Sequence, residues 1–266
     1  MAAVSEWTHF ALTSEDTNSM AYGLLLRDAL SEAVIPGVKE LCRELDRLAK
    51  KHAADPLLAR THGQPAVGTT FGKEFRVFQA RLQRQLAQLG KTVVLVKLNG
   101  AVGNFNAHAV AFPGVNWRKF GISFAARFNN GKSMKLAANP ATTQIEPHDN
   151  QAEIFDNLRR INIILTDFCQ DVWRYISDGL ITQKPAAGEI GSSTMPQKVN
   201  PIDFENAEGN LGLANALFIY FSAKLPISRL QRDLSDSTVQ RNIGSAFAYS
   251  VIAYASILRG LTKIEI

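Results

Sequence analysis

Apolar residues recur along most of this chain at steps of three and four, the spacing of one face of an α-helix. One stripe covers residues 71–96, so we expect a single helix there. A second covers 154–175 and alternates four and three strictly, and a third covers 243–261. Strict alternation is the heptad pattern of helices packed nearly parallel in a bundle. The pattern therefore predicts several long helices that bury their stripes on one another, some of them on other subunits.

The first helix has a well-defined start in the sequence. Thr13 or Ser14 can cap it, and Glu15 and Asp16 follow in the first turn, where the helix dipole favours acidic side chains. The Pro-Gly pair at 36–37 is expected to interrupt this helix.

Strands are not expected, because no period-two run is bounded by hairpin turns. The sequence contains no internal repeat or low-complexity linker, so we expect one domain over residues 1–266. The last helix continues to the final residues without a glycine stop, and both ends of the domain are expected to be cut. Gly-, Pro- and Asn-rich loops are predicted at 54–69, 99–114, 129–148, 179–202 and 224–235.

Charge and composition indicate which classes of binding partner and which cellular compartment to expect. The net charge is +5 and the pI about 9.2, but Lys and Arg are scattered, which favours a small anionic substrate over nucleic acid. The longest apolar stretch, 247–258, is too short to span a membrane, and the N-terminus lacks the pattern of a secretory signal. Cys42 and Cys169 suit neither a disulfide framework nor a zinc site, so a cytoplasmic protein without metal or organic cofactor is expected.

Two polar loops carry candidate binding groups ahead of long helices. His62 lies in RTHGQP, among Thr61, Gln64 and two chain-breaking residues, which suits an imidazole fixed near a ligand. The other histidines at 9, 52 and 108 are better explained as structural. Gln144 lies in TTQIEPHD; this stretch either caps the following helix or offers an amide donor to a carboxylate.

A third loop, GEIGSSTMPQKVNP at 188–201, combines flexible glycines with hydroxyl groups and a cation. Ser192 and Ser193 supply hydroxyl and backbone N–H groups, and Lys198 supplies a positive charge. Asn200 leads into a helix expected to begin near residue 203. A flexible surface loop is the alternative, but its mixture of polar groups with Met and Val suits a lid over a ligand.

A fourth candidate covers 228–242, where arginines mix with hydroxyl and amide donors at the start of a helix. This composition suits a phosphate cradle, although half of the cluster could serve as ordinary helix caps. The cluster contains three arginines, at 229, 232 and 241, and hydroxyl groups that include Ser237 and Thr238.

Two of these motifs resemble a known group of enzymes. GSSTMPQKVNP resembles the signature of the fumarase/aspartase superfamily, and RTHGQPA resembles its threonine-histidine motif. Neighbouring strings are similar to the bacterial-type adenylosuccinate lyase branch: LTSEDTNS, LNGAVGNFNAH, TTQIEPHD, VNPIDFENAEGNLGLANA and LPISRLQRDLSDSTVQRN. The resemblance implies an all-α fold, the long-helix bundle of this superfamily, which assembles into a multi-subunit helical core. It also implies a homotetramer whose active sites are shared between subunits.

The resemblance implies two eliminations that break a C–N bond beside a carboxylate. One releases fumarate from adenylosuccinate to give AMP, and the other uses the succinylated aminoimidazole carboxamide ribotide of purine synthesis. Ser192 is implied as the general base and His62 as the general acid on the purine nitrogen. Implied substrate contacts are Thr13, Ser14, Thr61, Gln144, Ser193, Lys198, Asn200, Asn206, Arg232 and the run Ser237 to Arg241, with Arg232 and that run at the phosphate.

The sequence also departs from the family pattern. The resemblance implies smaller helical domains before residue 7 and after residue 266, which are expected to be absent from this chain, and the stretch 118–140 is longer than usual. Two other readings stay open. One is a noncatalytic scaffold or assembly protein of the same fold. The other is a lyase of this superfamily that acts on another substrate, such as argininosuccinate.

Overall fold

The computed structural model describes residues 2–184 and 198–266. The chain forms two compact units, each assembled from three separate stretches of sequence. Unit 1 comprises Met1–Ala33, Leu89–Asp156 and Phe218–Ile243, and unit 2 comprises Val34–Gln88, Asn157–Leu217 and Gly244–Ile266. Along the described ranges, no helix combines the length and the apolar character that a membrane crossing requires.

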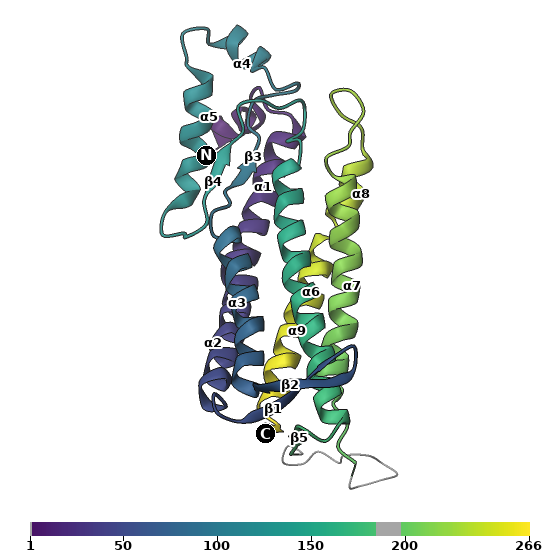
Figure 1. Cartoon of the computed structure of the whole chain (residues 1–266). Coiled ribbons are helices and arrows are strands. Elements are labelled where there is room, and N and C mark those ends of the chain that lie inside the picture. The colour runs from purple at the N-terminus through teal and green to yellow at the C-terminus, as the bar shows by residue number, and fades with distance from the viewer. Residues whose placement is uncertain (1, 185–197) are drawn as a thin grey trace. The chain divides into compact units, whose positions relative to one another are not determined.

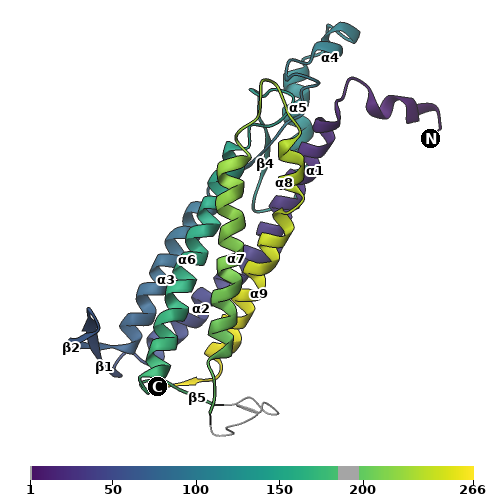
Figure 2. The same ribbon diagram turned by 90° about the vertical axis from the view of Figure 1, so that its right-hand side faces the viewer.

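Unit 2 is built from long helices that run side by side in both views (Figures 1 and 2). The predicted helices over 154–175 and 243–261 are confirmed, and the helix expected near residue 203 begins one residue earlier. The helices are α2 (Ile35–Lys51), α3 (Phe71–Leu89), α6 (Asp149–Ser177), α7 (Ile202–Lys224) and α9 (Ile243–Leu261), of which all except α2 begin or end in unit 1.

The core of unit 2 follows the predicted heptads. Ile161, Leu165 and Phe168 on α6 are almost completely buried. A polar triad interrupts this apolar core: the Tyr254 hydroxyl donates to Asn162 Oδ1 at 2.8 Å, and Asn162 Nδ2 donates to Ser250 Oγ at 3.0 Å. Burial raises the pKa of Tyr254, so the phenol stays a neutral donor. Since buried polar groups are costly unless satisfied, this triad favours one alignment of α6 against α9.

Strands occur where loops were predicted. An antiparallel hairpin of β1 (Pro56–Thr61) and β2 (Gln64–Thr70) occupies nearly all of the predicted loop 54–69. β5 (Thr182–Gln183) pairs with β6 (Ile264–Glu265), so the last helix ends at Leu261, and the prediction that it continues to the final residues is wrong. The missed signal in the hairpin is its two-residue turn, His62-Gly63, in which both residues have positive φ, 55° and 73°. Such a turn matches the twist of two paired strands and favours Gly at the second position.

Unit 1 combines α1 (Ser14–Ala29) with a short parallel strand pair, β3 (Val94–Val96) and β4 (Leu136–Ala138). The prediction of one helix over 71–96 is therefore wrong beyond Leu89. Gly90 ends the helix, and the β-branched residues that follow suit an extended strand. Gly23 lets α1 approach this pair, because a Cβ there would lie 2.3 Å from Val96 Cγ1. The other helices are α4 (Asn106–Ala111), α5 (Trp117–Ala126) and α8 (Ser235–Gln240).

The prediction that the Pro-Gly pair at 36–37 interrupts the first helix is wrong. This helix passes instead through a π-helical turn, Leu30–Val34, into α2. Pro36 occupies the first turn of α2, directly after the π-helical turn. The predicted start is confirmed: Thr13 is the N-cap residue, with extended backbone angles.

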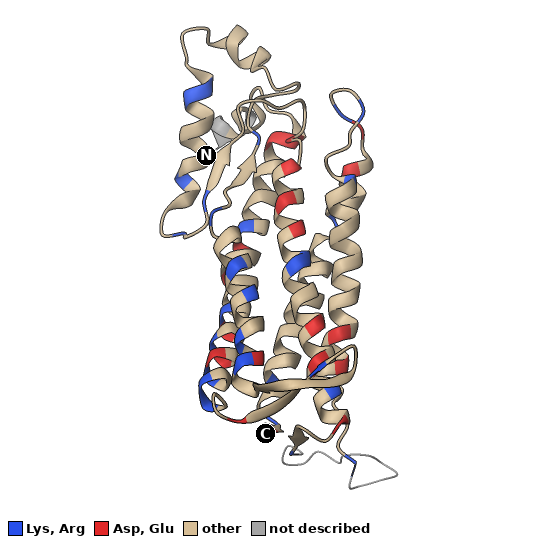
Figure 3. Cartoon of the chain, viewed as in Figure 1, with Lys and Arg blue, Asp and Glu red and all other residues tan. Residues whose placement is uncertain are grey.

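Charge is unevenly distributed along the chain. No Asp or Glu occurs between Glu74 and Glu146. Figure 3 shows Lys and Arg but no acidic residue on α5 and in the segments around the strands β3 and β4, while acidic residues resume at α6. The scattered positive charge inferred from composition is thus partly concentrated in one stretch of unit 1.

Candidate active site

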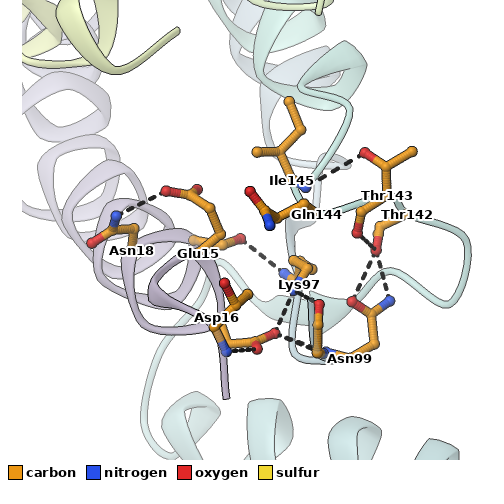
Figure 4. A network of polar contacts seen from close by, with 12 residues as sticks. Glu15, Asp16, Asn18, Lys97, Asn99, Thr142, Thr143, Gln144 and Ile145 are labelled. Atoms are coloured by element: carbon orange, nitrogen blue, oxygen red, sulfur yellow. Dashed lines mark hydrogen bonds and ion pairs between the residues drawn. The ribbon is translucent and has the colours of Figure 1, made fainter. Parts of the chain in front are cut away.

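A fully buried ion pair organises the start of α1 in unit 1. Lys97 Nζ lies 2.6 Å from Asp16 Oδ1, and both side chains are 0% exposed. The same carboxylate oxygen accepts the backbone N–H groups of Asn99 at 2.9 Å and Gly100 at 3.2 Å. Asp16 Oδ2 accepts the N–H of Thr13 at 2.9 Å. Figure 4 shows the two charged groups directed at one another, so Asp16 fixes both the helix start and the segment after β3.

Burial and the neighbouring negative charge shift the pKa of Lys97 in opposite directions. Loss of hydration lowers the pKa of Lys97, and the Asp16 carboxylate opposes that shift. Lys97 Nζ also donates to the carbonyl of Gly100 at 2.6 Å, so two of its three donors are satisfied by protein oxygens. The pair is thus a structural anchor with good hydrogen-bond geometry.

This anchor continues to the segment that contains Gln144. The Asn99 amide and the Thr142 hydroxyl exchange hydrogen bonds at 2.7 and 3.0 Å. Gly103, at φ 83°, lies so close to this segment that a Cβ there would be 2.2 Å from the carbonyl oxygen of Thr142. Only glycine combines that φ with such an approach. Residues 99–103 therefore fix the backbone just before Gln144.

Gln144 and Arg232 lie together in unit 1. Arg232 Nη1 donates to Gln144 Oε1 at 3.3 Å, and Arg232 Nη2 pairs with Glu15 Oε1 at 2.8 Å. The Arg232 and Glu15 side chains are only 14% and 5% exposed. Asn18 Nδ2 donates to the same Glu15 oxygen at 2.8 Å (Figure 4). The structure thus brings together α1 just after Thr13 and Ser14, the Gln144 segment and the segment before α8.

A second buried group follows directly along the chain. His148 is 3% exposed and has φ 65°. Its Nε2 lies 3.2 Å from Gln240 Nε2 on α8, and its backbone N–H donates to Glu146 Oε2 at 2.7 Å. Loss of hydration lowers the pKa of His148 to about 4, against the opposing charge of Asp236. The imidazole is therefore neutral near pH 7. The other predicted phosphate ligands, Ser237, Thr238 and Arg241, lie on or next to α8.

In unit 2, His62 and Thr61 lie at the tip of the β1–β2 hairpin, and both are exposed. Arg60 Nη1 donates to the carbonyl of Gly63 at 3.1 Å, which braces the turn. A pocket of about 430 Å³ lies beside the hairpin and is lined partly by Arg60, Gly63 and Tyr175. The imidazole of His62 is thus presented on a braced, solvent-facing turn.

The remaining predicted residues lie around the start of α7. Lys198 is exposed and Asn200 half-buried, and Val199 between them accepts a hydrogen bond from Gln183 Nε2 at 3.2 Å. Asn206 is exposed on α7, and its Oδ1 accepts from Asn210 Nδ2 at 2.6 Å. Ser192 and Ser193 lie outside the described residues.

Lys97 is the functional candidate that sequence reasoning missed. It occurs in the run VVLVKLNG, where apolar residues flank a single cation. A lysine in a buried strand must be paired, because an isolated buried charge costs too much free energy. That signal was present, but it could not identify Asp16 as the partner.

A family model described as "Lyase" matches residues 1–215, most of the chain. The chain belongs to the lyase family of the fumarase/aspartase superfamily. A second family model, described as "Adenylosuccinate lyase C-terminal", matches residues 228–266 of this lyase-family chain. The resemblance inferred from RTHGQPA and GSSTMPQKVNP is thereby confirmed.

Curated relatives in the lyase family match nearly the whole chain. It is 54% identical over 258 residues to a protein named adenylosuccinate lyase from Legionella pneumophila, covering 97% of this chain and 55% of that protein. It is 52% identical over 264 residues to the adenylosuccinate lyase of Escherichia coli, covering 99% of this chain and 57% of the relative. For the Vibrio cholerae protein of the same name, identity is 51% over 264 residues, with the same coverage. The chain thus spans about half the length of these relatives.

Proposed function

We propose that residues 1–266 are the central helical-bundle domain of an adenylosuccinate lyase. The substrates would be adenylosuccinate, which yields AMP and fumarate, and succinylaminoimidazole carboxamide ribotide. The observation that carries this proposal is the 52% identity to the E. coli adenylosuccinate lyase over 99% of the chain. The contacts among Glu15, Gln144 and Arg232 support it, because they place an amide and a cation in one buried cluster.

The chemistry needs a base, an acid and a site for negative charge. In our proposal the Ser192 oxygen takes a proton from the succinyl carbon, and that C–H electron pair forms the new C=C bond. The C–N bond breaks as its electrons move to the purine-side nitrogen, which receives a proton from His62. Negative charge builds on the neighbouring carboxylate meanwhile, and cations and N–H donors placed beforehand stabilise it. Thr61, Gln144, Ser193, Lys198 and Asn200 would supply those contacts.

The nucleotide phosphate would be held by Ser237, Thr238 and Arg241, together with Arg232. Arg232 already pairs with Glu15, but among the described residues its buried Nε has no hydrogen-bond partner. An unpaired buried N–H favours an additional acceptor such as a phosphate oxygen. Thr13, Ser14 and Asn206 would complete the substrate contacts.

We also propose that the protein is a homotetramer with active sites shared between subunits. On α7, the large apolar side chains of Leu213, Ile219 and Tyr220 are 54%, 54% and 53% exposed. Side chains of this kind along one helix mark an interaction surface. Light scattering on the purified protein is expected to give the mass of four chains, and a single monomeric species would contradict this assembly.

The lyase proposal is tested by incubating the purified chain with adenylosuccinate and following the ultraviolet absorbance change as AMP forms. We expect turnover in the wild type and none in Ser192→Ala. Saturable AMP binding without turnover in the wild type would refute catalysis by this chain. Neither binding nor turnover would favour a noncatalytic assembly protein, and turnover of argininosuccinate instead would show that the substrate assignment is wrong.

A further inference from the structure

Helix α8 has two chemically different faces. It has six residues, Ser235–Gln240. Asp236, Val239 and Gln240 are buried and recur at the i, i+3 and i+4 spacing of one helix face. Ser237 is half-buried, whereas Thr238 and the following Arg241 are exposed. The face that holds α8 in the protein is therefore separate from the residues that we assign to the phosphate.

The buried face of α8 meets His148. Gln240 Nε2 lies 3.2 Å from His148 Nε2, and the contact is fully buried. The negative charge of Asp236, one helical turn earlier, raises the pKa of the imidazole against the effect of burial, and neither of its buried carboxylate oxygens has a hydrogen-bond partner among the described residues. Glu146, Asp149 and Lys224 are the other charged groups around the ring. Gln240 is thus the α8 residue that contacts His148.

A helix this short has little stability of its own, because nucleating one turn costs more than a few hydrogen bonds return. Its position must come from docking. Just before α8, the backbone N–H of Gln144 donates to the carbonyl of Gln231 at 3.2 Å, and Arg232 donates to the Gln144 side chain. Residues 144–148 therefore hold the 231–240 stretch at two places, one at each end.

We infer that His148 is a positioning residue: it anchors α8 through Gln240 and so fixes the spacing between Gln144 and the phosphate-binding face of that helix. This inference rests on the proposed function, in which Gln144 contacts the succinyl group and α8 the phosphate at the opposite end of the substrate. His148 itself, being buried behind α8, touches neither end.

The first test is independent of activity. His148→Asn removes the imidazole and preserves the backbone, because asparagine tolerates the positive φ at this position. Hydrogen–deuterium exchange of the peptide covering α8 is expected to speed up about tenfold or more, as a lost buried hydrogen bond implies. The matched control is His108→Asn, another buried histidine of unit 1, which packs on the Trp117 ring at 4.8 Å. It is expected to leave α8 exchange unchanged.

The second test uses the turnover assay. His148→Asn and Gln240→Leu are each expected to raise the KM for adenylosuccinate severalfold with little change in kcat. The double variant should add nothing further, because both remove the same contact. Unchanged α8 exchange in His148→Asn, or an equal change in His108→Asn, would overturn the inference. Faster α8 exchange without turnover in any variant would support the anchor and refute the proposed function.

Discussion

Replacing Lys97 with methionine is expected to lower the free energy of unfolding by about 3–5 kcal/mol, because Asp16 would remain as an unpaired buried charge. Both partners are 0% exposed, so water cannot replace the lost ammonium group without opening the structure. Methionine fills most of the lysine volume, which separates the loss of charge from the creation of a cavity. The midpoint of urea unfolding, followed by circular dichroism, measures the effect.

Lys132→Met is the matched control, since Lys132 pairs with Asp28 and Glu32 in the same unit but at the surface. Its urea midpoint should stay close to that of the wild type, because exposed ion pairs contribute little. The double variant Lys97→Met/Asp16→Asn should recover only part of the loss. The side-chain amide oxygen introduced at position 16 can still accept the backbone N–H groups of Asn99 and Gly100. The amide has no second oxygen to accept the N–H of Thr13. Equal midpoints for the two lysine variants would disprove the anchoring role.

His62→Asn is expected to reduce kcat for adenylosuccinate cleavage by about 10²–10⁴, the usual contribution of a general acid. The substitution suits the backbone well. His62 has φ 55° as the first residue of a two-residue hairpin turn, and asparagine followed by glycine is a preferred pair there. The variant therefore removes the imidazole while keeping or improving the hairpin. The absorbance assay gives the rate, and circular dichroism gives the thermal unfolding midpoint.

His9→Asn serves as the control for this change, because His9 is also exposed and belongs to no proposed site. Its kcat should match the wild type. A wild-type rate in His62→Asn would exclude His62 as the acid. A rate lost together with the folded signal would indicate a structural role instead.

The sequence predicted the helices of unit 2 well, because their apolar residues keep one period over many turns. Ile154 to Tyr175 is such a case, and α6 covers it completely. The apolar stripe over 71–96 gave a wrong prediction beyond Leu89, because an apolar strand can continue the spacing of the helix before it. Only Gly90 and the β-branched residues after it mark the change.

The candidate site was predictable residue by residue but not as an arrangement. Motifs identified Gln144 and Arg232 separately, although these residues lie 88 positions apart and their contact depends on the tertiary fold. The roles of Lys97 and His148 depend on partners equally distant in sequence, Asp16 and Gln240. Periodicity carries no information about such pairs, because it reports only which face of an element is buried.

The interleaved construction of the two units also constrains how the protein is made. Unit 1 needs Phe218–Ile243 and unit 2 needs Gly244–Ile266, so neither can fold completely until these late stretches have left the ribosome. During synthesis the apolar faces of the earlier helices therefore remain exposed to solvent until their packing partners are made. Nascent chains of this protein should therefore depend on chaperones that shield hydrophobic segments, and translation stalled before residue 218 should yield aggregation-prone products.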